Sequence, residues 1–319
     1  MRIINKNDFI QAAGPLDFLS AVEKAFLLQE KGDFFMPDRL HVSYNGNVLL
    51  LMPAFQNQYF GTKLVSVFPE NRQKGKPVIQ GTMLLNDGHT GEPLALMDAG
   101  MLTAFRTAAV GALGITYTTP KDVTRLGLIG AGTQGFHQVL FAAIVRNIRE
   151  IYLFDPYHPD LKTFAEKLKK YLPGKKIILE NDVAPLVSHA QVIITATTSE
   201  EPVIPETADI QGKHFIGIGS YKPEMREMPE KLFHQLQHLV IDTPHTRKES
   251  GDVALPLKNH WIKETQILRL GELINETKSI DVSKTTFFKT AGMALFDLLA
   301  AQMIYEKARE KNIGIDVEL

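Results

Sequence analysis

The decapeptide LGLIGAGTQG, residues 126–135, decides the fold of this chain. It joins an apolar run to a helical pattern through three glycines spaced G-x-G-x-x-G. Such glycines permit a tight strand-to-helix turn and close approach to a pyrophosphate, which the N-terminus of the helix then faces. We therefore expect a dinucleotide-binding turn, made by Gly130, Ala131, Gly132, Thr133, Gln134 and Gly135.

An acidic residue stands where such a turn needs one. Asp155 ends the next apolar run, EIYLFD, twenty residues after Gly135. A carboxylate at that place bonds the ribose hydroxyls of the cofactor and repels a 2′-phosphate. The following residues, PYHPD, include no arginine to receive such a phosphate. The pattern therefore favours NAD(H), while NADP(H) stays open because His158 is able to contact a phosphate.

Apolar strands alternate with helices or loops across residues 119–294. The strand segments after the turn are EIYLFD, KKIILE, AQVIITAT, HFIGIGS and HLVIDT. This alternation predicts an α/β fold with a central Rossmann domain, a doubly wound and mostly parallel sheet. Two pairs of residues follow strands on the cofactor side and are expected to line the nicotinamide pocket: Thr197 with Thr198, and Gly219 with Ser220.

The 125 residues before the turn have a different pattern. Apolar positions at helical spacing predict one helix or two over residues 7–29, and residues 41–97 predict strands joined by hairpin turns such as YNGN and NDGHTGE. An alanine-rich helix follows over residues 100–118, and a long helix with no strand after it closes the chain. We expect residues 1–118 and 295–319 to form an α+β domain, and residues 119–294 to form the Rossmann domain.

Composition excludes several classes of function. The chain has 319 residues, a formal net charge of −1 and no cysteine, which argues against a nucleic-acid or membrane partner, disulfides and thiolate catalysis. The N-terminus lacks the features of a signal peptide, and no apolar run reaches the length of a membrane span. We expect a cytoplasmic protein. Its ten histidines are scattered, so no metal site is predicted.

Three basic residues lie among apolar or small neighbours: Arg39, Lys63 and Arg106. An enzyme that binds carboxylate substrates uses such cations to hold the acid group. Taken one at a time, each is more simply interpreted as a structurally paired or snorkelling side chain. Arg226, Glu227 and Asp297 are interpreted as surface ion pairs or helix charges, and residues 245–252 as a polar loop that borders the site or starts a helix.

Several motifs in this order and spacing resemble the ornithine cyclodeaminase/μ-crystallin family. They include LMPAF, GTKLVSVFPEN, QGTMLLNDGHTGEPLALMD, TAFRTAAVGALG, LGLIGAGTQG, GIGSYKPEMREMP and TAGMALFDL, and they cover nearly the whole chain. The resemblance implies a homodimer with NAD(P)-linked chemistry on a small amino or imino acid. It implies that Arg39 and Arg106 grip the substrate carboxylate, and that Lys63 helps to hold it or relays a proton beside the reacting carbon.

Two positions depart from the cyclodeaminase pattern. Leu50 stands where those enzymes carry a glutamate, and Tyr221 or Ser220 stands where they carry an aspartate. Without these acids the ring closure of ornithine lacks its base, whereas reduction of a cyclic imine requires neither. We expect an imine reductase, with Δ1-pyrroline-2-carboxylate to L-proline as the favoured reaction. Ornithine cyclodeamination, alanine dehydrogenase-like chemistry and a μ-crystallin-like binding role remain alternatives.

Overall fold

The computed structural model describes residues 1–318, Arg72 by its backbone alone. The chain divides into two compact units. The first contains residues 1–106 and the chain from Met293 onward, and the second contains Thr107–Gly292. The boundary falls inside a helix, after Arg106, rather than at the end of that helix.

The second unit is built on a sheet of eight strands, and all of its neighbouring strands run parallel. In spatial order they are β13 (Ile267–Arg269), β12 (Leu239–Ile241), β14 (Thr286–Lys289), β11 (His214–Gly217), β10 (Val192–Thr195), β7 (Arg125–Ile129), β8 (Glu150–Phe154) and β9 (Lys176–Leu179). Because the chain adds β8 and β9 on one side of β7 and β10 on the other, the strand order reverses between β7 and β10. The doubly wound parallel sheet expected from the sequence is confirmed.

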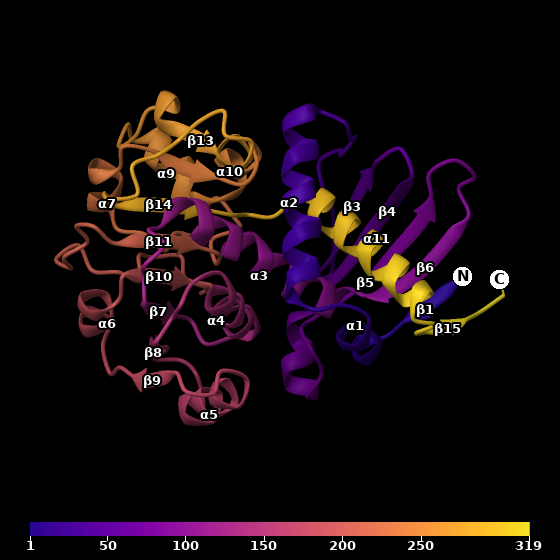
Figure 1. Ribbon diagram of the computed structural model, residues 1–319, viewed down its shortest axis with the longest axis horizontal. Helices are drawn as coiled ribbons and strands as arrows, with labels where there is room; N and C mark the ends of the chain where they lie inside the picture. Colours follow the sequence, from indigo (N-terminus) through magenta and orange to yellow (C-terminus); the bar gives the residue numbers. More distant parts are fainter. Residues whose placement is uncertain (319) are drawn as a thin grey trace. The chain divides into compact units, whose positions relative to one another are not determined.

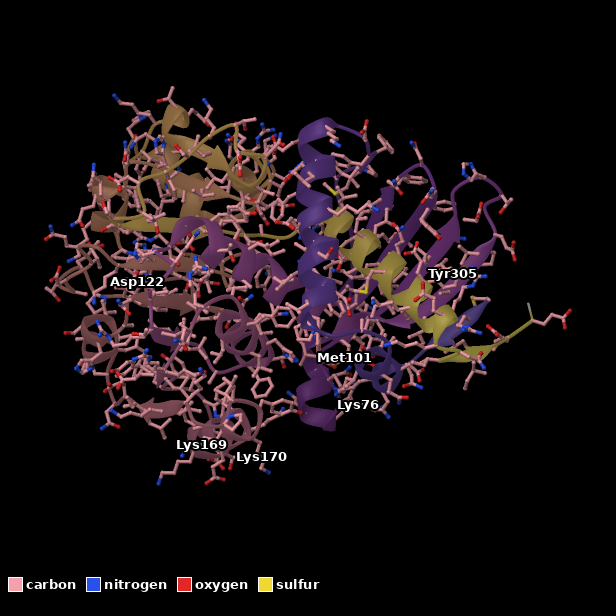
Figure 2. All side chains as sticks on the ribbon, in the orientation of Figure 1. Lys76, Met101, Asp122, Lys169, Lys170 and Tyr305 are labelled. Atoms are coloured by element: carbon pink, nitrogen blue, oxygen red, sulfur yellow. The ribbon has the colours of Figure 1, made fainter. Side chains whose placement is uncertain are left out.

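Helices connect these strands. They are α4 (Thr133–Val145), α5 (Leu161–Tyr171), α6 (Val183–His189), α7 (Glu230–Gln235), α8 (Thr246–Glu249), α9 (Gly251–Lys258), α10 (Leu270–Ile274) and the 3₁₀ turn η2 (Glu264–Gln266). The helix α5 shows why the sequence folds this way: Phe164 and Leu168 are buried, whereas Lys169 and Lys170 are exposed and extend away from the ribbon (Figure 2). Its amphipathic pattern therefore has one apolar stripe that packs inward.

The first unit contains a seven-stranded, mostly antiparallel sheet. In spatial order its strands are β15 (Ile315–Asp316), β1 (Arg2–Ile4), β6 (Pro93–Asp98), β5 (Ile79–Asp87), β4 (Tyr59–Val67), β3 (Asn47–Phe55) and β2 (Leu40–Tyr44). Its remaining elements are α1 (Lys6–Ala12), α2 (Pro15–Lys31), η1 (Pro69–Lys74), α3 (Ala99–Thr118), which continues into the second unit, and α11 (Ala294–Glu310).

The closing helix α11 lies across β3, β4 and β5 and packs along α2 (Figure 1). Twelve of its residues are buried, including Phe296, whose ring meets that of Phe26 edge to face at 4.7 Å. Met52, Lys63 and Met83 point to the helix-covered side of the sheet, since alternate residues of a strand share a face. The core of the first unit is thus formed by residues far apart in the sequence.

Four strands were not expected. A strand does follow the last helix: β15 pairs with β1, and Arg2 bonds Asp316 through two nitrogens at 2.8 and 2.6 Å. These two strands have only two and three residues, too few to show an alternating pattern. The other two are β14, which has four residues and lies between β11 and β12, and β13, which has three residues and lies at the edge of the sheet beside β12.

One helix is long and apolar enough to cross a membrane by length and composition among the described residues. It is α3, and 78% of its most apolar window is buried inside the protein. Such burial is typical of a core helix.

Candidate functional site

The glycine turn has the shape that a pyrophosphate requires. Gly130, just after β7, has φ +99°, and a Cβ there would lie 2.6 Å from the carbonyl oxygen of Ala196. A Cβ on Gly135 would lie 2.2 Å from the carbonyl oxygen of Gly130. Around Gly132, the exposed N-cap of α4, a Cβ would meet nothing within 4 Å. The outer glycines are thus required by protein packing, and the middle one faces open space at the N-terminus of the helix.

The acid after β8 is held beside this turn. Asp155 accepts hydrogen bonds from the backbone N–H of Ala131 at 2.8 Å and from that of Tyr157 at 3.0 Å. Thr133 is exposed at the first turn of α4, and Gln134 is half-buried. A carboxylate fixed next to an open glycine turn fits the adenosine ribose and pyrophosphate of a dinucleotide. The residues of the second unit therefore fit the cofactor that the turn implies.

The two other predicted pairs lie at the ends of neighbouring strands. Thr197 is half-buried and Thr198 exposed, after β10, whereas Gly219 and Ser220 are buried, after β11. The hydroxyl of Ser220 is already engaged, since it donates to the carbonyl of Met225 at 2.6 Å and lies 2.8 Å from the hydroxyl of Ser250.

Glu227 is not a surface charge, contrary to the sequence-based interpretation. It is fully buried, and its carboxylate accepts four hydrogen bonds from the last residue of β10 and from residues just after β10 and β11. Residues 245–252, interpreted as a polar loop or a helix start, form α8 and the beginning of α9, and Thr246, Ser250 and Asp252 are buried there. Arg226 is half-buried, with its guanidinium 5.3 Å from the ring centroid of Trp261.

A second group of charges lies inside the first unit. Lys63 on β4 donates to Asp297 on α11, with Nζ 2.8 Å from Oδ2. Arg106 on α3 donates to the other oxygen of the same carboxylate, with Nε 3.0 Å from Oδ1. All three side chains are buried. Arg106 bonds Asp297 through Nε and not through its two terminal nitrogens. Terminal guanidinium nitrogens can bind a carboxylate by two parallel hydrogen bonds.

The pKa of Lys63 is lowered to about 8, chiefly by burial; Asp297 opposes this shift, whereas the charges of Arg106 and Arg39 add to it. Burial alone raises the pKa of Asp297, but Arg106 and Lys63 outweigh it and hold that pKa below its usual value. At neutral pH the group therefore contains a carboxylate and a lysine close to its titration point. This is the protonation behaviour expected of a proton donor or acceptor.

The interpretation of Asp297 as a surface ion pair or helix charge was wrong. The residue is fully buried and joins two of the three predicted cations. Its sequence context, MALFDLLAAQM, contained a signal: a lone acid in an otherwise apolar run requires a buried cationic partner. Arg39, half-buried just before β2, is close enough for its charge to act on Lys63.

The remaining positions lie elsewhere in the two sheets or outside them. Leu50 is half-buried on β3 opposite Val65, and Tyr221 is 45% exposed after β11. No group of three or more histidine and acidic side chains suited to a metal ion is found within the described part of the chain.

Comparison with known proteins places this arrangement in context. The model of the ornithine cyclodeaminase/mu-crystallin family matches residues 10–312. A Delta(1)-pyrroline-2-carboxylate reductase from Bacillus cereus is 31% identical over 280 residues, 85% of each chain. The solved structure of the Thermococcus litoralis enzyme of that name, in complex with NADH and L-proline, is 31% identical with a TM-score of 0.93, over 99% of this chain and 100% of that one. An archaeal alanine dehydrogenase dimer with bound NAD is 28% identical with a TM-score of 0.91, over 100% and 99%.

Replacement of Asp297 tests whether the buried charges depend on one another. We expect Asp297→Asn to destabilise the protein by roughly 3–5 kcal/mol, because two buried cations lose their anion. Denaturant unfolding at pH 7 measures the change. Glu70→Gln is the control, since Glu70 is 80% exposed in its pair with Lys74 and contributes about 1 kcal/mol or less. Equal stability of the two variants would contradict this account of the group.

Proposed function

The chain belongs to the ornithine cyclodeaminase/mu-crystallin family, and from this premise we propose that it reduces the C=N bond of a cyclic imino acid, with Δ1-pyrroline-2-carboxylate to L-proline as the favoured reaction. The protein is an NAD(H)-dependent oxidoreductase, and the solved structures of two relatives contain NADH or NAD. The observation that carries the proposal is the buried group of Lys63, Asp297 and Arg106.

The cations of this group suit an imino acid with one carboxylate. In this proposal Arg106 and Arg39 hold the substrate carboxylate, which orients the C=N bond and offsets the unfavourable burial of the guanidinium groups. Asp297 fixes Arg106 through Nε and so leaves the terminal nitrogens directed to the ligand.

Lys63 supplies the proton of the reaction. The bound nicotinamide provides a hydride to the imine carbon, and the ammonium of Lys63 donates one proton to the imine nitrogen, so that C=N becomes CH–NH. Asp297, 2.8 Å from Nζ, keeps the amine protonated near neutral pH despite its burial. A donor with a pKa near the working pH transfers its proton efficiently.

Ring closure of ornithine is disfavoured by the positions that replace the two cyclodeaminase acids. Leu50 is apolar, and Tyr221 is largely exposed. Neither provides a base for the amine of an open-chain substrate. Alanine dehydrogenase chemistry remains the second candidate, because an archaeal relative with that name is 28% identical and shares the fold over the whole chain.

Nicotinamide absorbance at 340 nm tests the activity directly. We expect the purified protein to oxidise NADH faster with Δ1-pyrroline-2-carboxylate than with its six-membered analogue. With Δ1-pyrroline-2-carboxylate as the substrate, we expect NADH to be oxidised faster than NADPH. Turnover only with pyruvate and ammonia would replace the proposal by alanine dehydrogenase activity. Ammonia release from ornithine without imine reduction would contradict it. Tight cofactor binding without turnover of any of these compounds would favour a binding protein.

The pH dependence tests Lys63. Its pKa is lowered to about 8, so the ammonium form is present below that pH and lost above it. We expect kcat/KM for imine reduction to fall as pH rises through about 8. Lys63→Gln should lower kcat/KM by roughly 10²–10⁴-fold and remove this limb of the profile. Asp297→Asn should move the limb to lower pH, because Asp297 raises the pKa. An unchanged limb in Lys63→Gln would assign it to another group.

We also propose a cytoplasmic homodimer that assembles through the first unit. The strand β2 is at the edge of the sheet, all five of its residues are exposed, and Leu40, Val42 and Tyr44 are 54, 45 and 75% accessible. An exposed edge strand that carries three large apolar side chains favours a covering partner. The archaeal alanine dehydrogenase is itself a dimer.

Sedimentation velocity tests the assembly. We expect wild-type protein to sediment as a dimer at micromolar concentration and the double variant Val42→Lys, Tyr44→Lys as a monomer. Ile10→Lys is the control, since Ile10 is 62% exposed on α1 and lies outside the edge strand. A monomeric wild type, or a double variant that remains dimeric, would overturn the proposed interface.

A further inference from the structure

We propose that Glu227 is a positioning residue for the nicotinamide half of the cofactor, acting through the chain segments that follow β10 and β11. The inference rests on the proposed binding of NAD(H) by the second unit. It concerns a buried carboxylate that makes no contact with the glycine turn itself but fixes the residues beside that turn.

The position of Glu227 in the sheet carries the first part of the argument. In a doubly wound sheet the two halves of a dinucleotide lie across the point where the strand order reverses, outside the carboxyl ends of the strands. Here that point lies between β7 and β10. The glycine turn and Asp155 follow β7 and β8, so they serve the adenosine half. The ends of β10 and β11 are therefore left for the nicotinamide half.

Glu227 joins those two ends. Its Oε1 accepts from the backbone N–H and the hydroxyl of Thr197, both at 2.8 Å. Its Oε2 accepts from the hydroxyl of Thr195 at 2.8 Å and from the backbone N–H of Gly219 at 2.9 Å. One carboxylate thus sets the spacing between the segment after β10 and the segment after β11.

The segment held in this way also touches the glycine turn. A Cβ on Gly219 would lie 2.1 Å from the carbonyl oxygen of Thr197, and a Cβ on Gly130 would lie 3.0 Å from Cγ2 of Thr197. Thr197 therefore packs against Gly219 on one side and Gly130 on the other. Any shift of Thr197 changes the wall next to the turn, which is how a residue without cofactor contact alters cofactor binding.

The carboxylate is chemically required for these four bonds. A glutamine offers one oxygen and one NH₂ group, and the NH₂ group would face either the N–H of Thr197 or that of Gly219, donor against donor. Asp252 on α9 fixes the backbone of Glu227, because its Oδ1 accepts from the N–H of Glu227 at 2.9 Å and from that of Met228 at 3.0 Å. The amine of Lys289 lies 3.9 Å from the other oxygen of Asp252, and burial lowers the pKa of this lysine.

Isothermal titration of Glu227→Gln with NADH and with ADP tests the inference, because ADP lacks the nicotinamide half. We expect the Kd of NADH to rise roughly tenfold, as for one buried donor left unpaired, and the Kd of ADP to stay within about twofold. A purely structural role would weaken both ligands alike, or lower the melting temperature and weaken neither. Either result would overturn the proposal.

Two further variants keep the test decisive. Thr195→Val removes one of the four bonds from a fully buried strand residue, and should raise the Kd of NADH roughly threefold with ADP unchanged even if Glu227→Gln folds poorly. Asp242→Asn is the matched control, since this buried acid accepts from the N–H groups of Thr243, Ala291 and Gly292 at the ends of β12 and β14. Asp242→Asn should lower stability and should change the Kd of NADH and the Kd of ADP by the same factor. If it weakened NADH binding selectively, as expected for Glu227→Gln, the proposed role of Glu227 would be contradicted.

Wild-type binding separates this inference from the proposed function. Neither titration requires an imine, so failure of the reductase assay leaves the prediction for Glu227 intact. Wild-type protein that binds ADP but not NADH would overturn both the cofactor and the inference. Wild-type protein that binds NADH, together with an unselective Glu227→Gln, would overturn the inference alone.

Discussion

The carboxylate of Asp297 is the constraint on which the first unit depends. It is buried on a helix that the chain adds last, and it neutralises cations from a strand and a helix that come about 190 to 230 residues earlier. An uncompensated lysine inside a protein loses its charge or destabilises the fold. The closing helix is therefore needed for the chemistry of Lys63 as well as for the apolar core.

The ion pairs of Asp297 with Lys63 and Arg106 also explain how Lys63 is able both to carry a proton and to release it. Full compensation would keep Lys63 permanently protonated, and no compensation would leave it neutral. Asp297 divides its two oxygens between Lys63 and Arg106, and the pKa of Lys63 consequently stays near 8. A substrate carboxylate would add negative charge to this group and raise the proton affinity of the amine on binding.

The second unit uses buried carboxylates in another way. Glu227 and Asp242 bind backbone N–H groups and hydroxyls at the carboxyl ends of parallel strands, where these groups have no strand partner. Each acid thus satisfies several donors and joins segments that the sheet itself does not connect. A cofactor edge made of loops acquires fixed geometry without a metal or disulfide among the described residues.

Sequence patterns predicted the fold to the extent that local chemistry determines it. The helix begins at Thr133 as the glycine spacing requires, and the strand that ends just before Asp155 has the expected position, because tight turns and apolar alternation are local properties. The strands β1, β13, β14 and β15 escaped prediction, since two to four residues carry no period and their pairing is decided by distant segments.

The candidate site divides along the same line. A cation among small or apolar residues is unusual, and this predicted Arg39, Lys63 and Arg106 as site residues. The interpretation of Asp297 and Glu227 as surface charges was wrong. A single acid carries no period, and its burial depends on partners that the fold brings from other parts of the chain. The burial of Asp297 is explained by its ion pair with Lys63, and the burial of Lys63 is explained by the same ion pair. Charged residues inside apolar runs are therefore better interpreted as a set, with each buried cation taken to imply a buried acid elsewhere in the chain.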